Sequence, residues 1–379
     1  MYSIEAYGKM LTDETRMGAY QEAIRRAVRP GAIVLDIGTG TGIHALMAAR
    51  AGAGHVYAIE PADAILLAPE IARANGLADR ITFIQDISTN VTLPTRADVV
   101  ISDLHGTLPW YQRHIPTIVD ARTRLMQVGG TLVPQLDEVF MAAVESPELY
   151  ARVTEPWRAQ PFGFDLAPVA SRTTQEYVRG RVGREAFLSD VHRIATLDYR
   201  SITDPDVTVE IELSPVRSGS LHGFMVWFDT VVFEDVRLTS APFEPEISYG
   251  SSFFPIAEPV NVTPGHTVRL TWRGTLQGDG YIWAWNVDVY DETGALLKGF
   301  RHTTLASQLP SMDRLRKRAP SFRPALGSDG TIDRIVLNMM TGERTNDEIA
   351  RAVMELAPDA FDSVDTAMER VRELSERYA

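Results

Sequence analysis

Apolar residues in the first third of the chain form short, nearly continuous runs separated by helical patterns. The runs cover residues 32–38, 55–60, 81–86, 97–103 and 129–135, and stretches such as IHALMAARAG lie between them. Strands that are apolar on both faces and alternate with helices form parallel sheets, which helices cover on both sides. The pattern therefore predicts an α/β, Rossmann-like domain over residues 1–135, with an N-terminal helix over 1–28.

The pattern changes to a period of two between residues 136 and 309. Long alternating stretches at 208–216, 220–235, 266–276 and 281–300 predict antiparallel strands, the last folded into a hairpin at residues 291–294. A helical insertion interrupts this region at about 146–175. Trp283 and Trp285 share one face of their strand, and we expect them in the core rather than in the wall of an acceptor pocket.

The last 70 residues follow a third sequence pattern. Residues 310–330 are rich in proline, glycine and basic side chains and predict a linker, whereas residues 331–379 predict a small helical domain. Gly342 breaks its helical pattern, and Thr345 with Glu348 forms a capping box that opens the next helix. A third helix is predicted from Ser363.

Composition excludes several kinds of chemistry. The 379 residues include no cysteine, which removes disulfides, cysteine-ligated metals and a thiol nucleophile, and we expect no metal site. The net charge of −13 argues against nucleic acid as a partner. No run of 18 apolar residues suggests a membrane segment, and no signal pattern opens the chain, so the predicted location is the cytoplasm.

The sharpest motif is a glycine-rich turn between the first predicted strand and a helix, Gly38-Thr39-Gly40-Thr41-Gly42. Ile43 stands where a dinucleotide fingerprint needs glycine, and no phosphate-loop lysine follows. Carboxylates instead mark three strand ends, at Asp36, Glu60 and Asp86. Glu60 is suited to accept both hydroxyls of a ribose and Asp86 to accept from an adenine amino group. A purely structural turn and a nicotinamide or flavin site remain alternatives.

This set of residues resembles the class I S-adenosyl-L-methionine-dependent methyltransferases, which implies S-adenosylmethionine as the cofactor. The stretch from Tyr7 to Arg16, with Tyr20, further resembles the opening helix of the protein arginine methyltransferases. The resemblance implies that Arg16 holds the cofactor carboxylate and that Met10 packs near the sulfur; a solvated helix charge is the alternative for Arg16. The cofactor residues so predicted are Met10, Arg16, Asp36, Gly38, Thr39, Gly40, Glu60, Asp86 and Ile87.

The resemblance to arginine methyltransferases covers about residues 1–305. Residues 161–166 and 223–229 are similar to the segment after that family's dimerisation arm and to one of its barrel strands. The resemblance implies that residues 136–309 form a β-barrel acceptor domain and that the insertion at 146–175 is the dimerisation arm. It also implies that the protein is a homodimer.

The loop after the fourth strand departs from that family's pattern. Its members clamp a guanidinium between two glutamates, and the matching residues here are Asp103 and the uncharged Gln112. Residues 247–249 stand at the usual Thr-His-Trp loop and contain no histidine. Because a planar guanidinium is best matched by full carboxylates, the loop favours methyl transfer to N or O of a peptide or a natural-product intermediate. Genuine arginine methylation, and a non-catalytic recruitment or regulatory protein that only binds the cofactor, remain alternatives.

Two histidines add candidate chemistry to this loop, at positions 105 and 114. An imidazole titrates near neutral pH and suits proton removal from an acceptor. Asp103 or His105 is the candidate base, and Tyr111 with Gln112 the candidate pair that orients the acceptor. Purely structural roles for these side chains remain open.

Residues 335–350 in the C-terminal region resemble the winged-helix fold of PqqD-like proteins. The resemblance implies a leader or precursor peptide as a partner. A basic run in residues 314–318 is a solvated linker or a contact for an acidic leader. A packing extension with no ligand is the alternative, and the acid-rich composition of the last 49 residues argues against nucleic acid.

Overall fold

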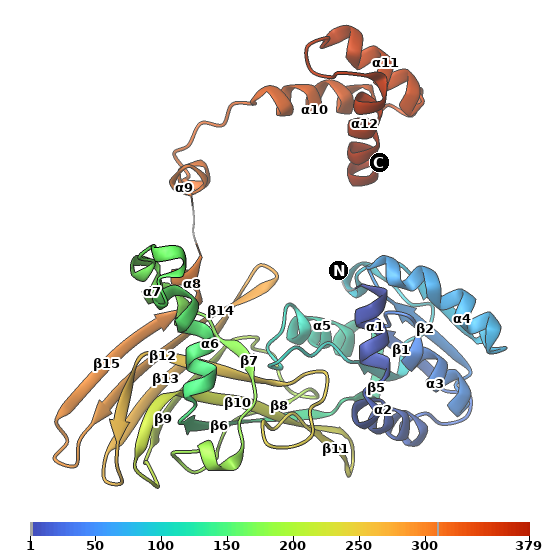
Figure 1. Cartoon of the computed structure of the whole chain (residues 1–379). Helices are drawn as coiled ribbons and strands as arrows, with labels where there is room; N and C mark the ends of the chain where they lie inside the picture. Colours follow the sequence, from blue (N-terminus) through green and yellow to red (C-terminus); the bar gives the residue numbers. More distant parts are fainter. Residues whose placement is uncertain (1–2, 309–310) are drawn as a thin grey trace. The chain divides into compact units, whose positions relative to one another are not determined.

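The structure is a computed structural model that describes residues 3–308 and 311–379. It divides into two compact units, residues 1–308 and 309–379, which are treated separately below (Figure 1). Residues 1, 2, 309 and 310, which fall at the ends of predicted segments, lie outside the described residues.

A five-stranded parallel sheet forms the first half of the larger unit, in the order β3-β2-β1-β4-β5. All five predicted strands are confirmed, as β1 (Ile33–Ile37), β2 (His55–Ile59), β3 (Ile81–Ile84), β4 (Ala97–Ser102) and β5 (Met126–Val133). Its α-helices are α2 (Glu14–Ala27), α3 (Ile43–Ala51), α4 (Ala68–Ala74) and α5 (His114–Asp120). Short 3-10 turns lie at η1 (Asp63–Leu67), η2 (Ala78–Arg80) and η3 (Ser88–Asn90), and a π-helical turn at η4 (Ala121–Leu125). The predicted Rossmann-like sheet is therefore present.

The N-terminal segment is two helices rather than the single predicted one. α1 (Ile4–Leu11) ends before Thr12, and Asp13 opens α2 by accepting a hydrogen bond from the Arg16 backbone N–H at 3.0 Å. A side chain that caps a helix in this way holds its own backbone outside the helical region. The break turns α1 away from α2, so that α1 lies beside the glycine turn, where the Tyr7 ring sits close to Gly40.

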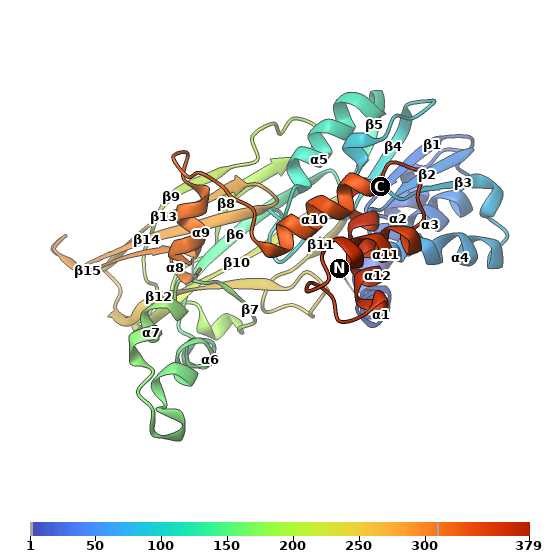
Figure 2. The ribbon, with the colours of Figure 1, turned by 90° about the horizontal axis from the view of Figure 1, so that it is seen from above.

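Two antiparallel sheets form the second half of this unit (Figure 2). One has the order β7-β12-β10-β6-β8, with β11 paired to β10, and the other has the order β15-β14-β13-β9. Their strands are β6 (Leu136–Val144), β7 (Val178–Gly180), β8 (His192–Asp198), β9 (Val207–Leu213), β10 (Gly219–Phe233), β11 (Val236–Thr239), β12 (Ser251–Val262), β13 (Thr267–Gln277), β14 (Gly280–Tyr290) and β15 (Leu296–Thr303). The four predicted strand regions and the hairpin at 291–294 are confirmed.

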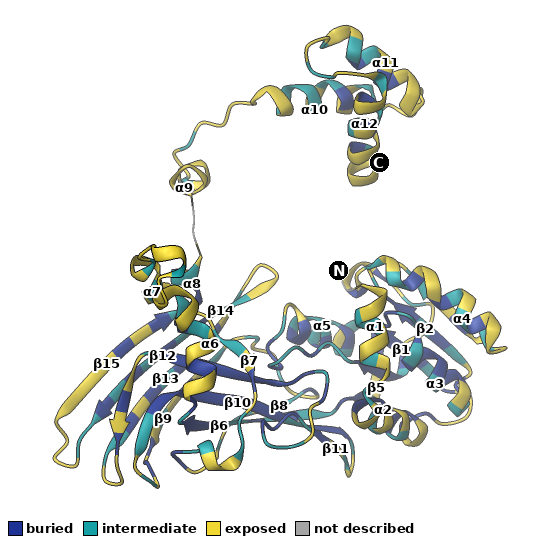
Figure 3. Cartoon of the chain, viewed as in Figure 1, coloured by how far each residue is buried: buried dark blue, intermediate teal, exposed yellow. Residues whose placement is uncertain are grey.

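A single buried apolar cluster runs through the parallel and the antiparallel parts (Figure 3). Trp283 and Trp285 are 1% and 0% exposed and belong to this cluster, which confirms the expectation that they are core. Trp272 from β13 stacks on Trp283 with ring centroids 4.5 Å apart. These aromatic rings therefore stabilise the antiparallel part and do not line an open pocket.

The insertion between β6 and β7 is helical, as predicted. It holds α6 (Pro147–Arg158), a 3-10 turn η5 (Pro161–Gly163) and α7 (Ala167–Thr173). Two further short helices follow elsewhere in the unit, η6 (Arg184–Ala186) and α8 (Thr304–Ser307). The Phe162 side chain, at the turn between α6 and α7, is 97% exposed, so this segment presents apolar surface to its surroundings.

The smaller unit contains only helices within residues 311–379: α9 (Met312–Arg318), α10 (Ser328–Met339), α11 (Asn346–Leu356) and α12 (Val364–Tyr378). Helices α10 to α12 enclose a small core of their own around Val336, Val353 and Val371. The capping box of Thr345 and Glu348 is confirmed. The predicted linker differs from the structure in that α9 and the first turn of α10 fall within it, because Ser311 caps α9. No helix in the described parts of either unit is both long and apolar enough to cross a bilayer.

Candidate active site

The glycine turn lies at the carboxyl end of β1 and depends on glycine. Gly38, Gly40 and Gly42 have φ values of +76°, +54° and +90°, a left-handed region that glycine adopts without strain. A Cβ at Gly38 would overlap the Leu104 side chain, and one at Gly40 would lie 2.7 Å from the Tyr7 ring. The turn is thus packed between α1 and the loop that follows β4.

Asp36 is the most buried carboxylate of this turn. One oxygen accepts a hydrogen bond from the Thr39 hydroxyl at 2.5 Å, while Oδ1 has no hydrogen-bond partner among the described residues. Burial raises the pKa of Asp36 to about 7, although the hydrogen bond from Thr39 opposes the shift. A cation bound beside Oδ1 would favour the charged carboxylate.

The carboxylates at the next two strand ends lie at the same edge of the sheet. Glu60 accepts from the Gly40 N–H at 3.1 Å through one oxygen and from the Ala62 N–H at 2.9 Å through the other. Asp86 accepts from the Ile87 N–H at 2.7 Å and from the Asn90 side chain at 2.9 Å. These bonds fix the orientation of both carboxylates along the edge that the glycine turn also occupies.

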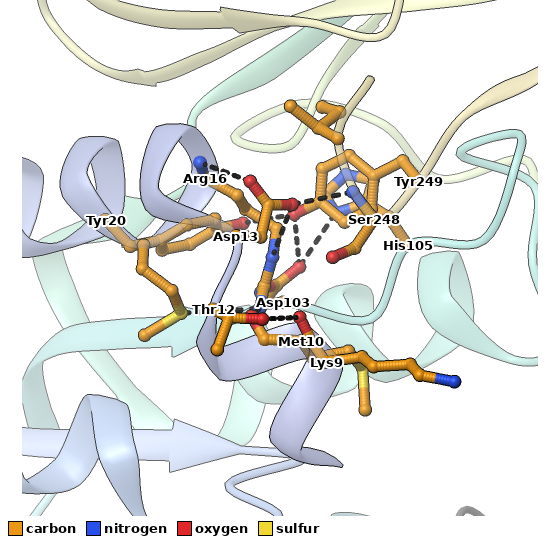
Figure 4. A network of polar contacts seen from close by, with 12 residues as sticks. Lys9, Met10, Thr12, Asp13, Arg16, Tyr20, Asp103, His105, Ser248 and Tyr249 are labelled. Atoms are coloured by element: carbon orange, nitrogen blue, oxygen red, sulfur yellow. Dashed lines mark hydrogen bonds and ion pairs between the residues drawn. The ribbon is translucent and has the colours of Figure 1, made fainter. Parts of the chain in front are cut away.

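Arg16 lies in a network of polar contacts at the start of α2 (Figure 4). Its Nη1 forms an ion pair with Asp103, and its Nη2 donates to the Met10 carbonyl at 2.7 Å. Its Nε lies 3.7 Å from a carboxylate oxygen of Asp13. Arg16 is buried, so the solvated alternative does not describe it. The Met10 contact is made by the backbone oxygen, and Arg16 itself is already paired to an acidic side chain.

Asp103 is the centre of this network. It accepts from the Tyr249 hydroxyl as well as from Arg16, and its Oδ1 lies 3.4 Å from His105 Nδ1. Burial alone would raise its pKa, but the hydrogen bond with His105 and the charge of Arg16 hold the pKa well below the usual range. Asp103 is therefore an anion at every physiological pH.

His105 does not reach the surface of the loop. Its side chain is 0% exposed, and Nε2 lies 2.9 Å from Asp137. Burial opposes protonation, but the charge of Asp137 and the hydrogen bonds with Asp103 and Asp137 raise the pKa of His105 to about 9. An imidazolium has no lone pair to accept a proton, so this environment opposes the role of general base near neutral pH.

The remaining loop residues separate into buried and exposed ones. His114 is buried at the start of α5, with Nδ1 3.0 Å from the Pro109 carbonyl, and burial lowers its pKa to about 3. Gln112 is exposed with φ of +45°, and its amide donates to the Tyr111 hydroxyl at 3.2 Å. Trp110 anchors the loop through edge contacts with Trp272 and Trp283.

The structure brings in residues that the sequence did not single out as site residues: Asp13, Asp137, Tyr199 and Thr230. Tyr249 belonged only to the segment matched to the Thr-His-Trp loop. Of these residues, only Asp137 could have been singled out from the sequence, because its carboxylate stands at the start of a mostly apolar run.

Known proteins share both parts of the larger unit. Residues 13–146 match the family model described as ribosomal protein L11 methyltransferase, and residues 136–275 match that of the arginine methyltransferase oligomerization subdomain. Protein arginine N-methyltransferase 1 of Schizosaccharomyces pombe is 29% identical over 271 residues, which cover 69% of this chain and 79% of that protein.

Two solved structures have the same fold. Arabidopsis thaliana protein arginine methyltransferase 10 superposes with a TM-score of 0.70 at 21% identity, covering 80% of this chain and 98% of that one. The Trypanosoma brucei PRMT1 enzyme–prozyme heterotetrameric complex with AdoHcy gives 0.69 at 22% identity, with coverage of 78% and 97%.

The sheet, the glycine turn and these matches define an S-adenosylmethionine-dependent methyltransferase. More closely, the chain is a methyltransferase of the protein arginine methyltransferase type. The residues present fit the cofactor, because the unpartnered oxygen of buried Asp36 suits a cationic amino group and the oriented Glu60 suits a ribose.

Proposed function

We propose that this protein transfers a methyl group from S-adenosylmethionine to N or O of a peptide or natural-product intermediate other than an arginine guanidinium. The observation that supports this is the state of Asp103. Both of its oxygens are already engaged by groups of the protein itself, Arg16 on one and Tyr249 with His105 on the other. A second carboxylate is lacking, since Gln112 stands at the matching position.

A guanidinium presents five N–H donors and no acceptor. Binding one here would desolvate its charge against a single carboxylate that Arg16 already neutralises. A neutral acceptor carries no such cost. It gains instead from Gln112, whose amide both donates and accepts hydrogen bonds. Genuine arginine methylation remains the second candidate because the S. pombe relative carries that name.

Cofactor binding is assigned to the residues around the glycine turn: Met10, Arg16, Asp36, Gly38, Thr39, Gly40, Glu60, Asp86 and Ile87. When bound, the cofactor supplies a methyl group whose bond to the sulfonium breaks, its electron pair passing to sulfur, as the acceptor lone pair forms the new bond. Asp103 and Tyr249 hold the loop between β4 and α5, residues 103–113 and here called the acceptor loop, next to this position. Tyr111 with Gln112 orients the acceptor. Because His105 is protonated and Asp103 is a very weak base, any proton lost from the acceptor passes to water.

We propose in addition that the two antiparallel sheets act as the barrel-type acceptor domain over residues 136–309. The segment from α6 to α7 would be the arm through which two copies form a homodimer. Its exposed Phe162 and Phe164 supply apolar contact surface for such an arm. A recruitment role for residues 331–379 toward a leader peptide is the corresponding proposal for the smaller unit. The capped helix α11 and its neighbours supply a folded surface for it, but residues 311–379 contain no strands of a wing.

The test is methyl transfer from tritiated S-adenosylmethionine to synthetic peptides that differ in one nucleophilic residue. The central residue of each peptide is arginine, lysine, histidine, asparagine or serine. Mass spectrometry identifies the residue that carries the methyl group. We expect transfer to a residue other than arginine. Gln112→Glu restores a second carboxylate and should raise any transfer to the arginine peptide at least several-fold, with Arg113→Gln as a neighbouring exposed control. Monomethylarginine as the main product of the unaltered protein would overturn the proposal.

A further inference from the structure

Five charged side chains of alternating sign run through the interior beneath the acceptor loop. In order they are Asp13, Arg16, Asp103, His105 and Asp137, and we refer to them as the charge ladder. Figure 4 shows its first four members. The side chains of all five are between 0% and 8% exposed. Buried charges are stable only when each is paired, so each member depends on the next.

Asp137 ends the ladder and has no part in the chemistry described above. It stands at the start of β6, in the antiparallel part, and its carboxylate is completely buried. One oxygen accepts from the Thr230 hydroxyl at 2.6 Å, and the other accepts from the Tyr199 hydroxyl and contacts His105 at 2.9 Å. A carboxylate held by three groups from three separate segments has one orientation.

His105 transmits this orientation because its ring is packed on all sides. The ring stacks on Phe228 with centroids 5.3 Å apart and an interplanar angle of 19°. Its Nδ1 faces Asp103 at 3.4 Å while its Nε2 faces Asp137. Both nitrogens therefore face carboxylates, an arrangement that an imidazolium satisfies with two N–H donors and a neutral ring with only one.

We propose that Asp137 is a positioning residue for methyl transfer. Through His105 it fixes the orientation of Asp103, and so ties the acceptor loop after β4 to the antiparallel sheet. The inference rests on the proposed function for its effect on turnover, but its effect on the charge of His105 does not depend on any acceptor.

The charge of His105 gives the sign of the expected pH dependence. The titratable and charged groups near the ring are Asp103, Asp137, Tyr199, Tyr249, His114 and, beyond Asp103, Arg16. His114 stays neutral because burial lowers its pKa, and the buried phenols of Tyr199 and Tyr249 have raised pKa values. With its pKa raised to about 9, His105 keeps its proton from acid pH through neutrality and loses it only as the pH rises through 9. Without the charge of Asp137, that loss should move down toward the ordinary range near 6.5.

The experiment compares Asp137→Asn with Asp229→Asn. Asp229 is the residue before Thr230 on β10 and is outside the ladder, so it controls for the same substitution on the neighbouring strand. In the full chain labelled with 15N-histidine, the His105 ring signals are assigned by their loss in His105→Gln. We expect a doubly protonated ring at pH 8 in the unaltered protein and in Asp229→Asn, and a neutral ring in Asp137→Asn.

Turnover on the best peptide of the panel above supplies the second readout. At pH 8, Asp137→Asn should lower kcat about tenfold to a hundredfold, the scale for a misplaced catalytic geometry, and leave the Kd for S-adenosylhomocysteine within about twofold. The deficit should shrink as the pH falls to 6, because the imidazole regains its proton there. A merely structural role predicts no such recovery.

Either of two results overturns the proposal: a neutral His105 at pH 8 in the unaltered protein, or unchanged kcat in a folded Asp137→Asn variant. If Asp137→Asn does not fold, Thr230→Val decides in its place, since it removes one hydrogen bond to Asp137 with little change in shape. It should lower kcat less than Asp137→Asn does and without recovery at pH 6, because Asp137 keeps its charge and His105 its proton. Unchanged kcat in Thr230→Val would overturn the proposal. If no peptide is methylated, the proposed function fails, while the imidazole signals still test the ladder.

Discussion

The glycine turn and the acceptor loop lie at one edge of the same parallel sheet but are held in different ways. The turn is held by local contacts: Asp36 bonds Thr39 three residues away, and Glu60 bonds Gly40 twenty residues away. The acceptor loop is held from a distance, since Asp103 contacts Arg16 at a separation of 87 residues and Tyr249 at 146.

This difference assigns separate tasks to separate parts of the chain. Of the residues proposed to bind the cofactor, those from Asp36 to Ile87 lie on the parallel sheet and its turns and are held by neighbouring sequence, whereas Met10 and Arg16 lie on α1 and α2. The charge and orientation of Asp103 depend on the antiparallel sheets through Tyr249, His105 and Asp137. The acceptor side can therefore change its chemistry through the antiparallel part while the cofactor side stays as it is. Three predictions test the contrast, beginning with the largest effect.

Asp103→Ala should destabilise the larger unit by about 3 to 5 kcal/mol, because it leaves Arg16 and His105 buried without their shared anion. All six tryptophans lie between residues 110 and 285, so urea denaturation followed by their fluorescence reports on this unit. The double variant Arg16→Met with Asp103→Leu removes both charges of the pair and should recover part of the loss. A single variant as stable as the unaltered protein would show that the ladder contributes little.

Glu60→Ala should weaken the binding of S-adenosylhomocysteine about tenfold to a hundredfold while leaving the ladder intact. The variant loses a charged acceptor for the ribose, worth about 1.5 to 3 kcal/mol, and leaves the Gly40 N–H without its partner. Isothermal titration calorimetry measures the change. Asp63→Ala, an exposed carboxylate that bonds Gln85, is the matched control and should bind within about twofold of the unaltered protein. Unchanged affinity in Glu60→Ala would place the cofactor elsewhere.

Asp36 should make cofactor affinity depend on pH, with the smallest effect of the three. With its pKa near 7, it must lose a proton to face a cationic amino group, so affinity should rise by up to about tenfold per pH unit below 7 and level off above it. His44 and His105, whose pKa values lie at about 4 and about 9, do not titrate in this window. Titrations of S-adenosylhomocysteine from pH 6 to 8 measure the slope, which Asp36→Asn should abolish. An affinity that falls as pH rises contradicts this assignment.

The sequence allowed the parallel sheet to be predicted strand by strand because each strand is a short apolar run bounded by turns. It served less well in the antiparallel part, where β6, β7, β8, β11 and β12 were missed. β12 carries two prolines and is buried along most of its first half, so it lacks regular alternation. The N-terminal helix was predicted as one element because its break depends on the capping bond of Asp13, which a helical pattern does not display.

The candidate site also has parts that the sequence defined and parts that it did not. The sequence by itself determined the glycine turn, the acidic strand ends and the departures at Asp103 and Gln112, since residue identity and short spacing are enough to define them. Only the tertiary structure decided that Arg16 pairs with Asp103 and that His105 lies between two carboxylates. The charge of a side chain depends on its burial and on which charges lie beside it, and both are set by segments that meet only when the sheets pack together.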